Sequence, residues 1–175
     1  MRSSLYLPAI VALAVSCSGN EDDSIDIVFD ACLAVSLTAA ADTRAGEIAS
    51  ICLAAAMWNE RAGTRLACEP NVDAQQLPIS FEKAAPLFYG LYRDEDGEIV
   101  INSVIEDGQT RAVVIAHEIG HAFGLEHLDG RASIMNSGNH TIEPTAADAD
   151  LLDTRWGQCP SAPGRAALEL PARRL

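Results

Sequence analysis

The sequence predicts an α+β domain, in which short strands and three helices share one core. Three segments have the spacing or the boundary residues of helices: residues 47–61, 111–123 and 142–156. Several runs between them are short and rich in branched or aromatic residues, which is typical of strands. With 175 residues, 49% of them hydrophobic, the chain is long enough for one ordinary domain and apolar enough to bury a core.

The N-terminal part of this domain is predicted to contain a strand, a helix and another strand. Residues 25–37 are rich in Ile, Val and Leu, and we expect one or two strands there. Residues 47–61 follow helical periodicity, with apolar side chains at Ile48, Ile51, Cys52, Ala55 and Trp58. Gly63 is expected to end this helix, and residues 65–68 to form the next strand.

Three further strand candidates follow. Residues 77–81 and 88–92 are short, whereas residues 98–104 form a more regular run. Asp96 and Gly97, which precede the last run, are a strong signal for a hairpin turn.

Two helices complete the predicted domain. Asp107 or Thr110 is expected to cap a helix over residues 111–123, since both side chains can accept a hydrogen bond from a backbone N–H group. Residues 142–156 are expected to form the last helix, with Pro144 near its first turn.

The charge of the chain excludes two classes of function. It has 12 basic and 25 acidic residues, a formal net charge of −13. A nucleic-acid binder needs a basic surface to meet phosphates, and so does a protein that binds anionic membranes through a polybasic patch. We therefore expect no nucleic-acid partner.

The start of the chain resembles the signal peptide of a bacterial lipoprotein. A positive charge is followed by the apolar residues 5–15, and small residues precede Cys17. The commonest lipoprotein motif has Leu where Ala14 stands. In this interpretation Cys17 is lipidated and becomes the first mature residue; the alternative is an ordinary signal peptide cleaved near Ser18.

These features predict four regions: a lipoprotein-type signal peptide in residues 1–16, a polar tether in 17–24, one folded domain in 25–158 and a flexible tail in 159–175. We expect a monomer exported to the bacterial cell envelope. Its membrane contact would be a lipid anchor in the periplasm or at the cell surface, and without the anchor it would be secreted.

Four other cysteines are candidates for two disulfides, because an even number in an exported chain suggests pairing. The first helix is predicted to end at Arg61, about 13 Å along its axis from Cys52. The strand that follows runs back over a similar distance to Cys68, so the two cysteines should lie side by side. This geometry favours Cys52–Cys68 and leaves Cys32–Cys159. The other pairings and four free thiols are the alternatives.

The most informative stretch lies in the helix predicted over residues 111–123 and just beyond it. His117 and His121 are four residues apart, so they point the same way from a helix and can present imidazole nitrogen to one ion. Glu118 lies beside them, within reach of a water on that ion. Gly124 lets the chain leave the helix and return His127 as a third ligand. Three histidines and a water are a catalytic zinc arrangement.

The short His-Glu-x-x-His pattern alone could arise by chance. The longer pattern from His117 to His127 fixes five residues (three His, one Glu and one Gly), which makes a chance match far rarer. It resembles the metzincin signature, whose downstream methionine, the Met-turn, matches Met135. The chain after His127 is most similar to matrixin catalytic domains, including an acidic residue at Asp148. The resemblance implies a zincin-like fold: a small twisted mixed sheet, a first long helix, an active-site helix and a C-terminal helix.

Two departures from the matrixin pattern concern the neighbourhood of the substrate. Leu128 follows the third histidine where matrixins have Ser, and Asn136 and Ser137 replace an aromatic residue and Pro after the methionine. Because these positions shape the substrate pocket, subsite specificity is not carried over from the family. The matrixin-type inhibitory cysteine motif is also not found in this sequence.

The resemblance implies a zinc metalloendopeptidase that cleaves proteins or peptides, with one catalytic Zn²⁺ bound by the three histidines. Glu118 is the expected general base. An extended substrate would pair with an edge strand, for which residues 98–104 are the candidate. A non-catalytic zinc-binding surface module is the alternative function.

Two weaker expectations remain. His140 could assist the oxyanion or contact the substrate, and a solvated loop histidine is the alternative. Asp94, Asp96 and Glu98 could bind Ca²⁺, but a plain acidic turn is the alternative and the sequence does not support calcium specifically.

Overall fold

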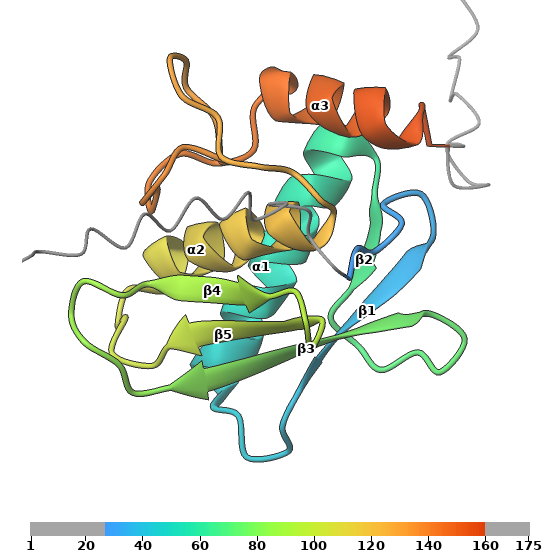
Figure 1. The fold of residues 1–175 in the computed structure, drawn as a ribbon. Coiled ribbons are helices and arrows are strands. Elements are labelled where there is room, and N and C mark those ends of the chain that lie inside the picture. Colours follow the sequence, from blue (N-terminus) through green and yellow to red (C-terminus); the bar gives the residue numbers. More distant parts are fainter. Residues whose placement is uncertain (1–26, 160–175) are drawn as a thin grey trace, which may run out of the picture.

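The computed structural model describes residues 27–159, which form a five-stranded sheet and three helices (Figure 1). The predicted signal peptide, Cys17, the tether and the tail from residue 160 onward lie outside these residues. In chain order the elements are β1 (Ala34–Ala39), α1 (Ala45–Ala62), β2 (Arg65–Ala67), β3 (Gln75–Glu82), β4 (Gly90–Arg93), β5 (Glu98–Asn102), α2 (Gly108–Ala122) and α3 (Ala146–Trp156).

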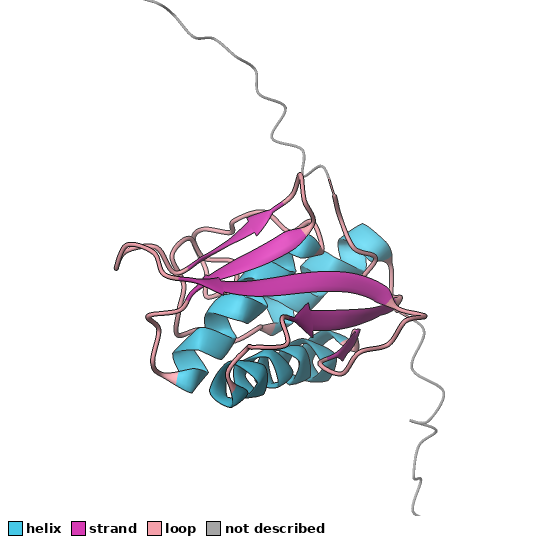
Figure 2. Cartoon of the chain, turned by 90° about the horizontal axis from the view of Figure 1, so that it is seen from below, coloured by secondary structure: helices cyan, strands magenta, loops and turns pink. Residues whose placement is uncertain are grey.

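The sheet is mixed, as the sequence predicted. Its strand order is β2-β1-β3-β5-β4, with every pair parallel except β4 and β5. Seen from below, the strands lie in front of α1 and α2, so both helices cover the same face of the sheet (Figure 2). This arrangement places α2 beside β4, the edge strand next to β5.

The prediction that residues 98–104 form the edge strand is wrong. The strand they contribute, β5, pairs with β3 on one side and β4 on the other, so β4 is the edge. The physical reason is burial: from Ile99 to Asn102 every residue of β5 is buried. A continuous buried run is typical of a central strand, which has neighbours on both sides and both faces covered.

The prediction of one or two strands over residues 25–37 is confirmed only for residues 34–37, which lie in β1, and it is wrong for residues 27–33. The preceding segment makes a turn in which the Asp30 carboxylate accepts a hydrogen bond from the Cys32 N–H at 2.8 Å. The Phe29 N–H donates to the Ala122 carbonyl at 2.8 Å, at the end of α2. Phe29 and Ala31 of this segment are buried outside the sheet, whereas Ile27 and Leu33 are exposed.

The helices begin close to where the sequence placed them. Asp107 is the N-cap of α2, and its carboxylate accepts from the Thr110 N–H at 2.7 Å. In α3 the N-cap is Thr145, so Pro144 precedes the helix instead of lying in its first turn. Gly63 ends α1 with a φ of 67°, a left-handed conformation that favours glycine.

The core between the helices is centred on Trp58 of α1. Its ring is fully buried and meets Phe123 edge to face, with ring centroids 6.1 Å apart. Its indole N–H donates to the Ala116 carbonyl at 2.8 Å, one residue before His117. The contact fixes α1 against the segment of α2 that carries the predicted metal ligands.

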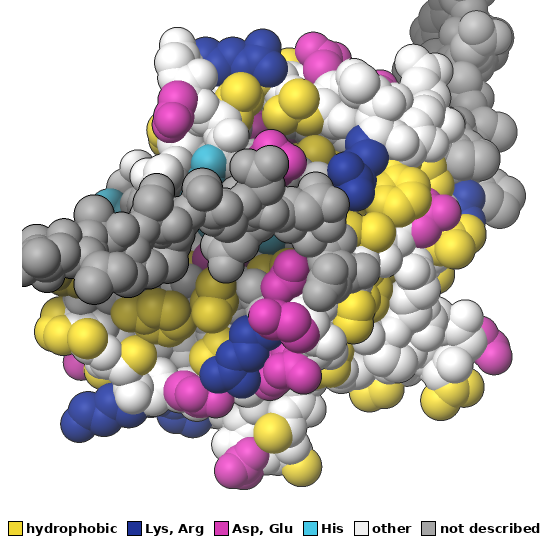
Figure 3. All heavy atoms as spheres, viewed as in Figure 1, with side chains coloured by type: hydrophobic (Ala, Val, Ile, Leu, Met, Phe, Trp, Pro, Cys, Tyr) yellow, Lys and Arg dark blue, Asp and Glu magenta, His cyan; other side chains and the backbone are white. Residues whose placement is uncertain are grey.

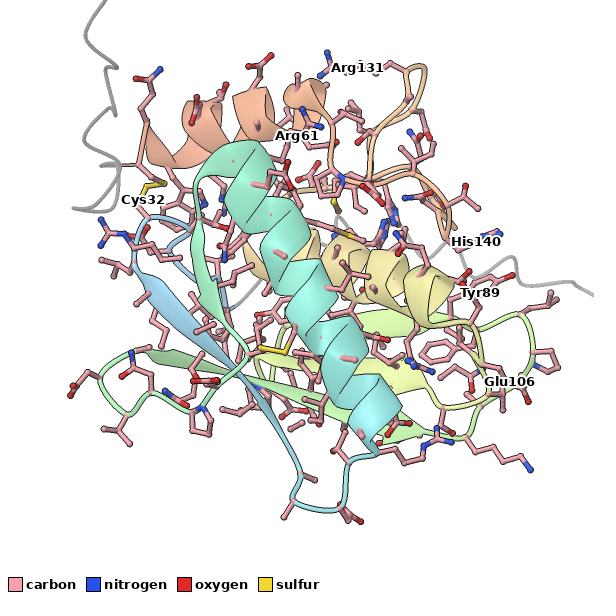
Figure 4. The ribbon with its side chains drawn as sticks, turned by 180° about the vertical axis from the view of Figure 1, so that it is seen from behind. Cys32, Arg61, Tyr89, Glu106, Arg131 and His140 are labelled. Carbon is pink, nitrogen blue, oxygen red and sulfur yellow. A yellow bond between two sulfur atoms is a disulfide. The ribbon has the colours of Figure 1, made fainter. Side chains whose placement is uncertain are left out.

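Within residues 27–159 there are two disulfides, Cys32–Cys159 and Cys52–Cys68, which confirms the pairing that the sequence favoured. The first joins the end of the described chain to the turn before β1, and Figure 4 shows it at Cys32. Such bonds persist in oxidising compartments, which indicates an extracellular or exported protein. Within residues 27–159 no helix has the length and apolar character that crossing a membrane requires.

Candidate metal centre and active site

The three predicted zinc ligands come together at the C-terminal end of α2. His117 and His121 project from successive turns of the helix, and His127 comes from the loop that follows. Each ring has a potential ligand nitrogen, and these three atoms all lie within 4.8 Å of one another. Histidine side chains reach the surface on this face of the molecule, with acidic and apolar side chains around them (Figure 3).

The turn that ends α2 also orients one of these ligands. Gly124 has a φ of 78°, and the Leu125 N–H donates back to the Gly120 carbonyl at 2.9 Å. The Leu125 carbonyl oxygen then lies 2.8 Å from His121 Nδ1. A left-handed backbone favours glycine at this turn, and the turn supplies the hydrogen-bond partner of His121, a predicted metal ligand.

The hydrogen bonds of the two helical histidines indicate which nitrogen of each ring carries the proton. His117 Nδ1 lies 2.6 Å from the Ile134 carbonyl oxygen, and His121 Nδ1 is held similarly by Leu125. Because a carbonyl oxygen can only accept, the hydrogen-bond network assigns the proton of each neutral ring to Nδ1. Both Nε2 atoms therefore carry lone pairs.

These two lone pairs face each other across 3.2 Å, the distance between His117 Nε2 and His121 Nε2. Neutral rings in this tautomer have no proton to place between the two atoms, so the contact is unfavourable unless a cation lies there. Two nitrogens bound to one tetrahedral Zn²⁺ are about 3.3 Å apart, given zinc–nitrogen bonds of about 2.0–2.1 Å. The residues present thus fit a zinc ion.

Burial favours the metal-binding form of both rings. It lowers the pKa of His121 to about 4, and it also lowers the pKa of His117. Burial has this effect because it disfavours the charged imidazolium. Both rings therefore stay neutral, which is the form that binds metal.

Glu118 is buried beside these ligands and is held by the edge strand. Its Oε2 accepts from the Tyr92 N–H of β4 at 2.9 Å. A Cβ on Gly90 would lie 3.1 Å from Glu118 Oε1 and 2.9 Å from a methyl group of Val114, so glycine lets β4 pass close to α2. Burial raises the pKa of Glu118 to about 8, with the Tyr92 N–H acting in the opposite direction.

Without metal, the protein is expected to lose stability as the pH rises from 6.5 to 8. The raised pKa of Glu118 means that the folded state still holds a proton that the unfolded state has released, so the free energy of unfolding falls with pH. The lowered pKa values of His117 and His121 have the opposite effect, which acts mainly below the ordinary value of 6.5 and offsets part of the loss above it. We expect a net loss of about 1 kcal/mol, measured by urea unfolding of chelator-treated protein. Glu118→Gln should remove the slope, and a flat wild-type profile would contradict the assignment.

Met135 lies beneath this region of α2. It is fully buried, and a Cβ on Gly120 would come within 2.3 Å of its sulfur. The Leu128 N–H donates to the Met135 carbonyl at 2.9 Å, which ties the segment after His127 to the turn that carries the methionine.

Two polar residues hold this turn in place. The Asn136 amide donates to the Leu128 and Arg131 carbonyls, which bridges the segment after His127 to the turn. The carboxylate of Asp148, fully buried in α3, accepts from the Ser133 hydroxyl and from the Ile134 N–H.

The structure places the other predicted site residues outside this cluster. His140 stacks on Tyr89 with ring centroids 5.0 Å apart and an interplanar angle of 14° (Figure 4). Among residues 27–159, His117, His121 and His127 are the group of three side chains whose potential ligand atoms lie close enough to hold one ion. Calcium binding at the acidic turn around Gly97 stays a prediction.

Sequence reasoning missed the backbone partners of the site. These are the Ile134 and Leu125 carbonyls and the Tyr92 N–H. A backbone group is present at every position, so it leaves no residue-type signal. Gly90 was a usable signal, because an isolated glycine in a strand often marks a close approach of another element.

The chain was compared with known protein families and structures. The family model for matrixin, a peptidase family, matches residues 38–154, more than half of the chain. Among solved structures, the chain is similar to high choriolytic enzyme 1, a hatching-enzyme zinc protease from the medaka fish Oryzias latipes, at 20% identity and a TM-score of 0.40. The match covers 58% of this chain and 50% of that one, so the chain spans about half the length of that enzyme. No curated protein matches the sequence. The chain belongs to the matrixin family of peptidases.

Proposed function

We propose that this protein is a zinc-dependent endopeptidase that hydrolyses peptide bonds in proteins or peptides. The observation that carries the proposal is the pair of unprotonated Nε2 atoms of His117 and His121 facing each other at 3.2 Å, with a buried carboxylate alongside. His127 would complete a set of three ligands and leave one coordination position open. When bound, zinc in such a site polarises the scissile carbonyl group and lowers the pKa of a coordinated water to about 7.

Glu118 would act as the general base. Its carboxylate takes a proton from the attacking water and later delivers it to the nitrogen of the leaving amine. The hydrogen bond from the Tyr92 N–H holds Oε2 and leaves Oε1 to accept the proton. Supporting this role, burial keeps the carboxylate in an environment where a pKa near the working pH is attainable.

The substrate would pair with β4, the edge of the sheet. Tyr92 turns its N–H away from β5 and toward Glu118, and Gly90 has the same orientation because it lies two residues earlier in the strand. The backbone groups of Gly90 can therefore pair with an extended peptide that lies beside Glu118. We further propose that Met135 forms the apolar floor under the histidines, in keeping with its burial against Gly120.

Metal removal tests the proposal. We expect one zinc ion per chain, cleavage of an unstructured protein substrate, complete loss of cleavage after treatment with a strong chelator, and recovery when Zn²⁺ is added back. His121→Ala should lower the zinc content and abolish cleavage. Cleavage that persists in the metal-free protein would contradict the proposed chemistry.

We also propose that the protein is anchored to the bacterial envelope through a lipid on Cys17, outside the described residues. The lipoprotein-like residues around it support this proposal, as do the disulfides typical of exported proteins. Mass spectrometry of the mature N-terminus should find a diacylated cysteine, and Cys17→Ser should shift the protein from the membrane fraction to the soluble fraction. An unmodified N-terminus near Ser18 would show that the anchor does not exist.

A further inference from the structure

Asn139 lies in the loop between Met135 and α3, and its amide reaches the carbonyl group that orients His117. Its Nδ2 donates to the Ile134 oxygen at 3.0 Å. His117 Nδ1 lies 2.6 Å from the same oxygen. Because a carbonyl oxygen offers two lone pairs, the two donors together satisfy it.

Both backbone polar groups of Ile134 have hydrogen-bond partners. Its N–H donates to Asp148 Oδ2 at 3.1 Å, and that same oxygen accepts from the Thr145 N–H and hydroxyl, each at 2.7 Å. The N–H side is therefore fixed to the start of α3. On the carbonyl side, Asn139 donates to the oxygen itself, and the Met135 N–H of the same peptide unit donates to Ser133 Oγ at 2.9 Å. The direction of the Ile134 carbonyl sets where the ring of His117 points, because His117 Nδ1 is hydrogen-bonded to it.

The amide of Asn139 is itself locked in orientation. Its Oδ1 accepts from the backbone N–H groups of Thr141 at 3.1 Å and Ile142 at 2.9 Å, and its Nδ2 also donates to the Ile142 carbonyl at 2.7 Å. These bonds assign oxygen and nitrogen of the amide without ambiguity, since one end meets only donors and the other only acceptors. The donor that meets Ile134 is thus held in place by the turn that follows it.

We propose that Asn139 is a positioning residue for the metal centre: by holding the Ile134 carbonyl, it keeps Nε2 of His117 directed at the point shared with the other two ligands. Hydrogen-bond partners of metal-bound histidine fix the ring and its tautomer, and their loss typically weakens metal binding by about 10- to 100-fold. The inference rests on the zinc site of the proposed function and does not require peptidase activity.

Zinc affinity measures this role directly. The Zn²⁺ dissociation constant of the whole protein, obtained by competition with a chromophoric chelator, is expected to rise about 10-fold in Asn139→Ala. Asn71→Ala is the matched control, because Asn71 Oδ1 accepts from the Asp73 N–H at 3.1 Å in an exposed turn between β2 and β3. That variant loses the same kind of turn, and its zinc affinity should stay within about two-fold of wild type.

A second substitution separates the metal-directed role from the turn. Asn139→Asp keeps the oxygen that accepts from Thr141 and Ile142, so the turn is retained. It replaces the N–H donors with an oxygen that faces the Ile134 and Ile142 carbonyls. The added negative charge would by itself favour a divalent cation, so weaker zinc binding in this variant must come from the lost donor.

Cobalt substitution adds a spectroscopic readout that a purely structural role would not change. The visible absorption bands of bound Co²⁺ report ligand geometry, and we expect them to shift in both Asn139 variants and to stay unchanged in Asn71→Ala. Wild-type zinc affinity with an unchanged cobalt spectrum in either Asn139 variant would overturn the inference. A wild-type protein that binds zinc but cleaves nothing would overturn only the proposed function, because zinc affinity is measured without substrate.

Discussion

Replacing Glu118 by glutamine is expected to lower kcat/KM for peptide hydrolysis by roughly 100- to 10,000-fold, the usual contribution of a general base. Glutamine has almost the same shape and retains an oxygen that can accept from the Tyr92 N–H. It cannot take a proton from water at neutral pH. Because the three histidines are untouched, zinc content should remain at one ion per chain, as measured by elemental analysis of the purified variant.

Glu106→Gln is the matched control for this substitution. Glu106 is exposed and lies before α2, so the same loss of one negative charge occurs away from the histidines. Its kcat/KM should equal that of wild type. If Glu118→Gln retained wild-type activity, or lost its zinc, the role of Glu118 as a general base would be contradicted.

Replacing Gly120 by alanine is expected to destabilise the fold although alanine is the better helix former. The added methyl group would lie 2.3 Å from the sulfur of Met135 and 3.4 Å from the ring of Trp58, and both side chains are fully buried. Overpacking of this kind costs about 1–3 kcal/mol, whereas the helix propensity gained is about 1 kcal/mol. We expect a lower free energy of unfolding by urea denaturation of the zinc-free protein, together with weaker zinc binding because Gly120 adjoins His121.

Gly108→Ala provides the control within the same helix. An added Cβ there would meet its nearest neighbours, the side chains of Ser50 and Arg111, at 3.7 and 3.8 Å, which is ordinary van der Waals contact. This variant should be as stable as wild type or slightly more stable. If the two substitutions changed the free energy of unfolding equally, the tight packing of Gly120 against Met135 would not be the cause of the destabilisation.

The parts of the site that depend on helical periodicity could be predicted from the sequence. His117 and His121 are one turn apart in any helix, and Gly124 is the residue type that allows the chain to turn back toward His127. The disulfide pairing could be predicted for a similar reason, because the lengths of a helix and of the strand that follows it tell how close Cys52 and Cys68 come. These predictions needed only local geometry.

The parts that depend on tertiary packing could not be predicted in this way. Neither Ile134 nor Asn139 has a sequence signature as a partner of His117, because one contributes a backbone carbonyl and the other lies 22 residues away from the histidine. The edge strand was misassigned because a hairpin signal does not say which of its strands lies outside. The unbroken apolar run of β5 was the available clue to its central position.

The most direct test of the account is an unbiased cleavage profile of the zinc-loaded protein against a peptide library, read by mass spectrometry beside Glu118→Gln. The account predicts new peptide termini with wild type and none with the variant, while both proteins contain one zinc ion per chain. No cleavage by a zinc-loaded, folded wild-type protein would contradict it and favour a zinc-binding surface module without catalytic activity.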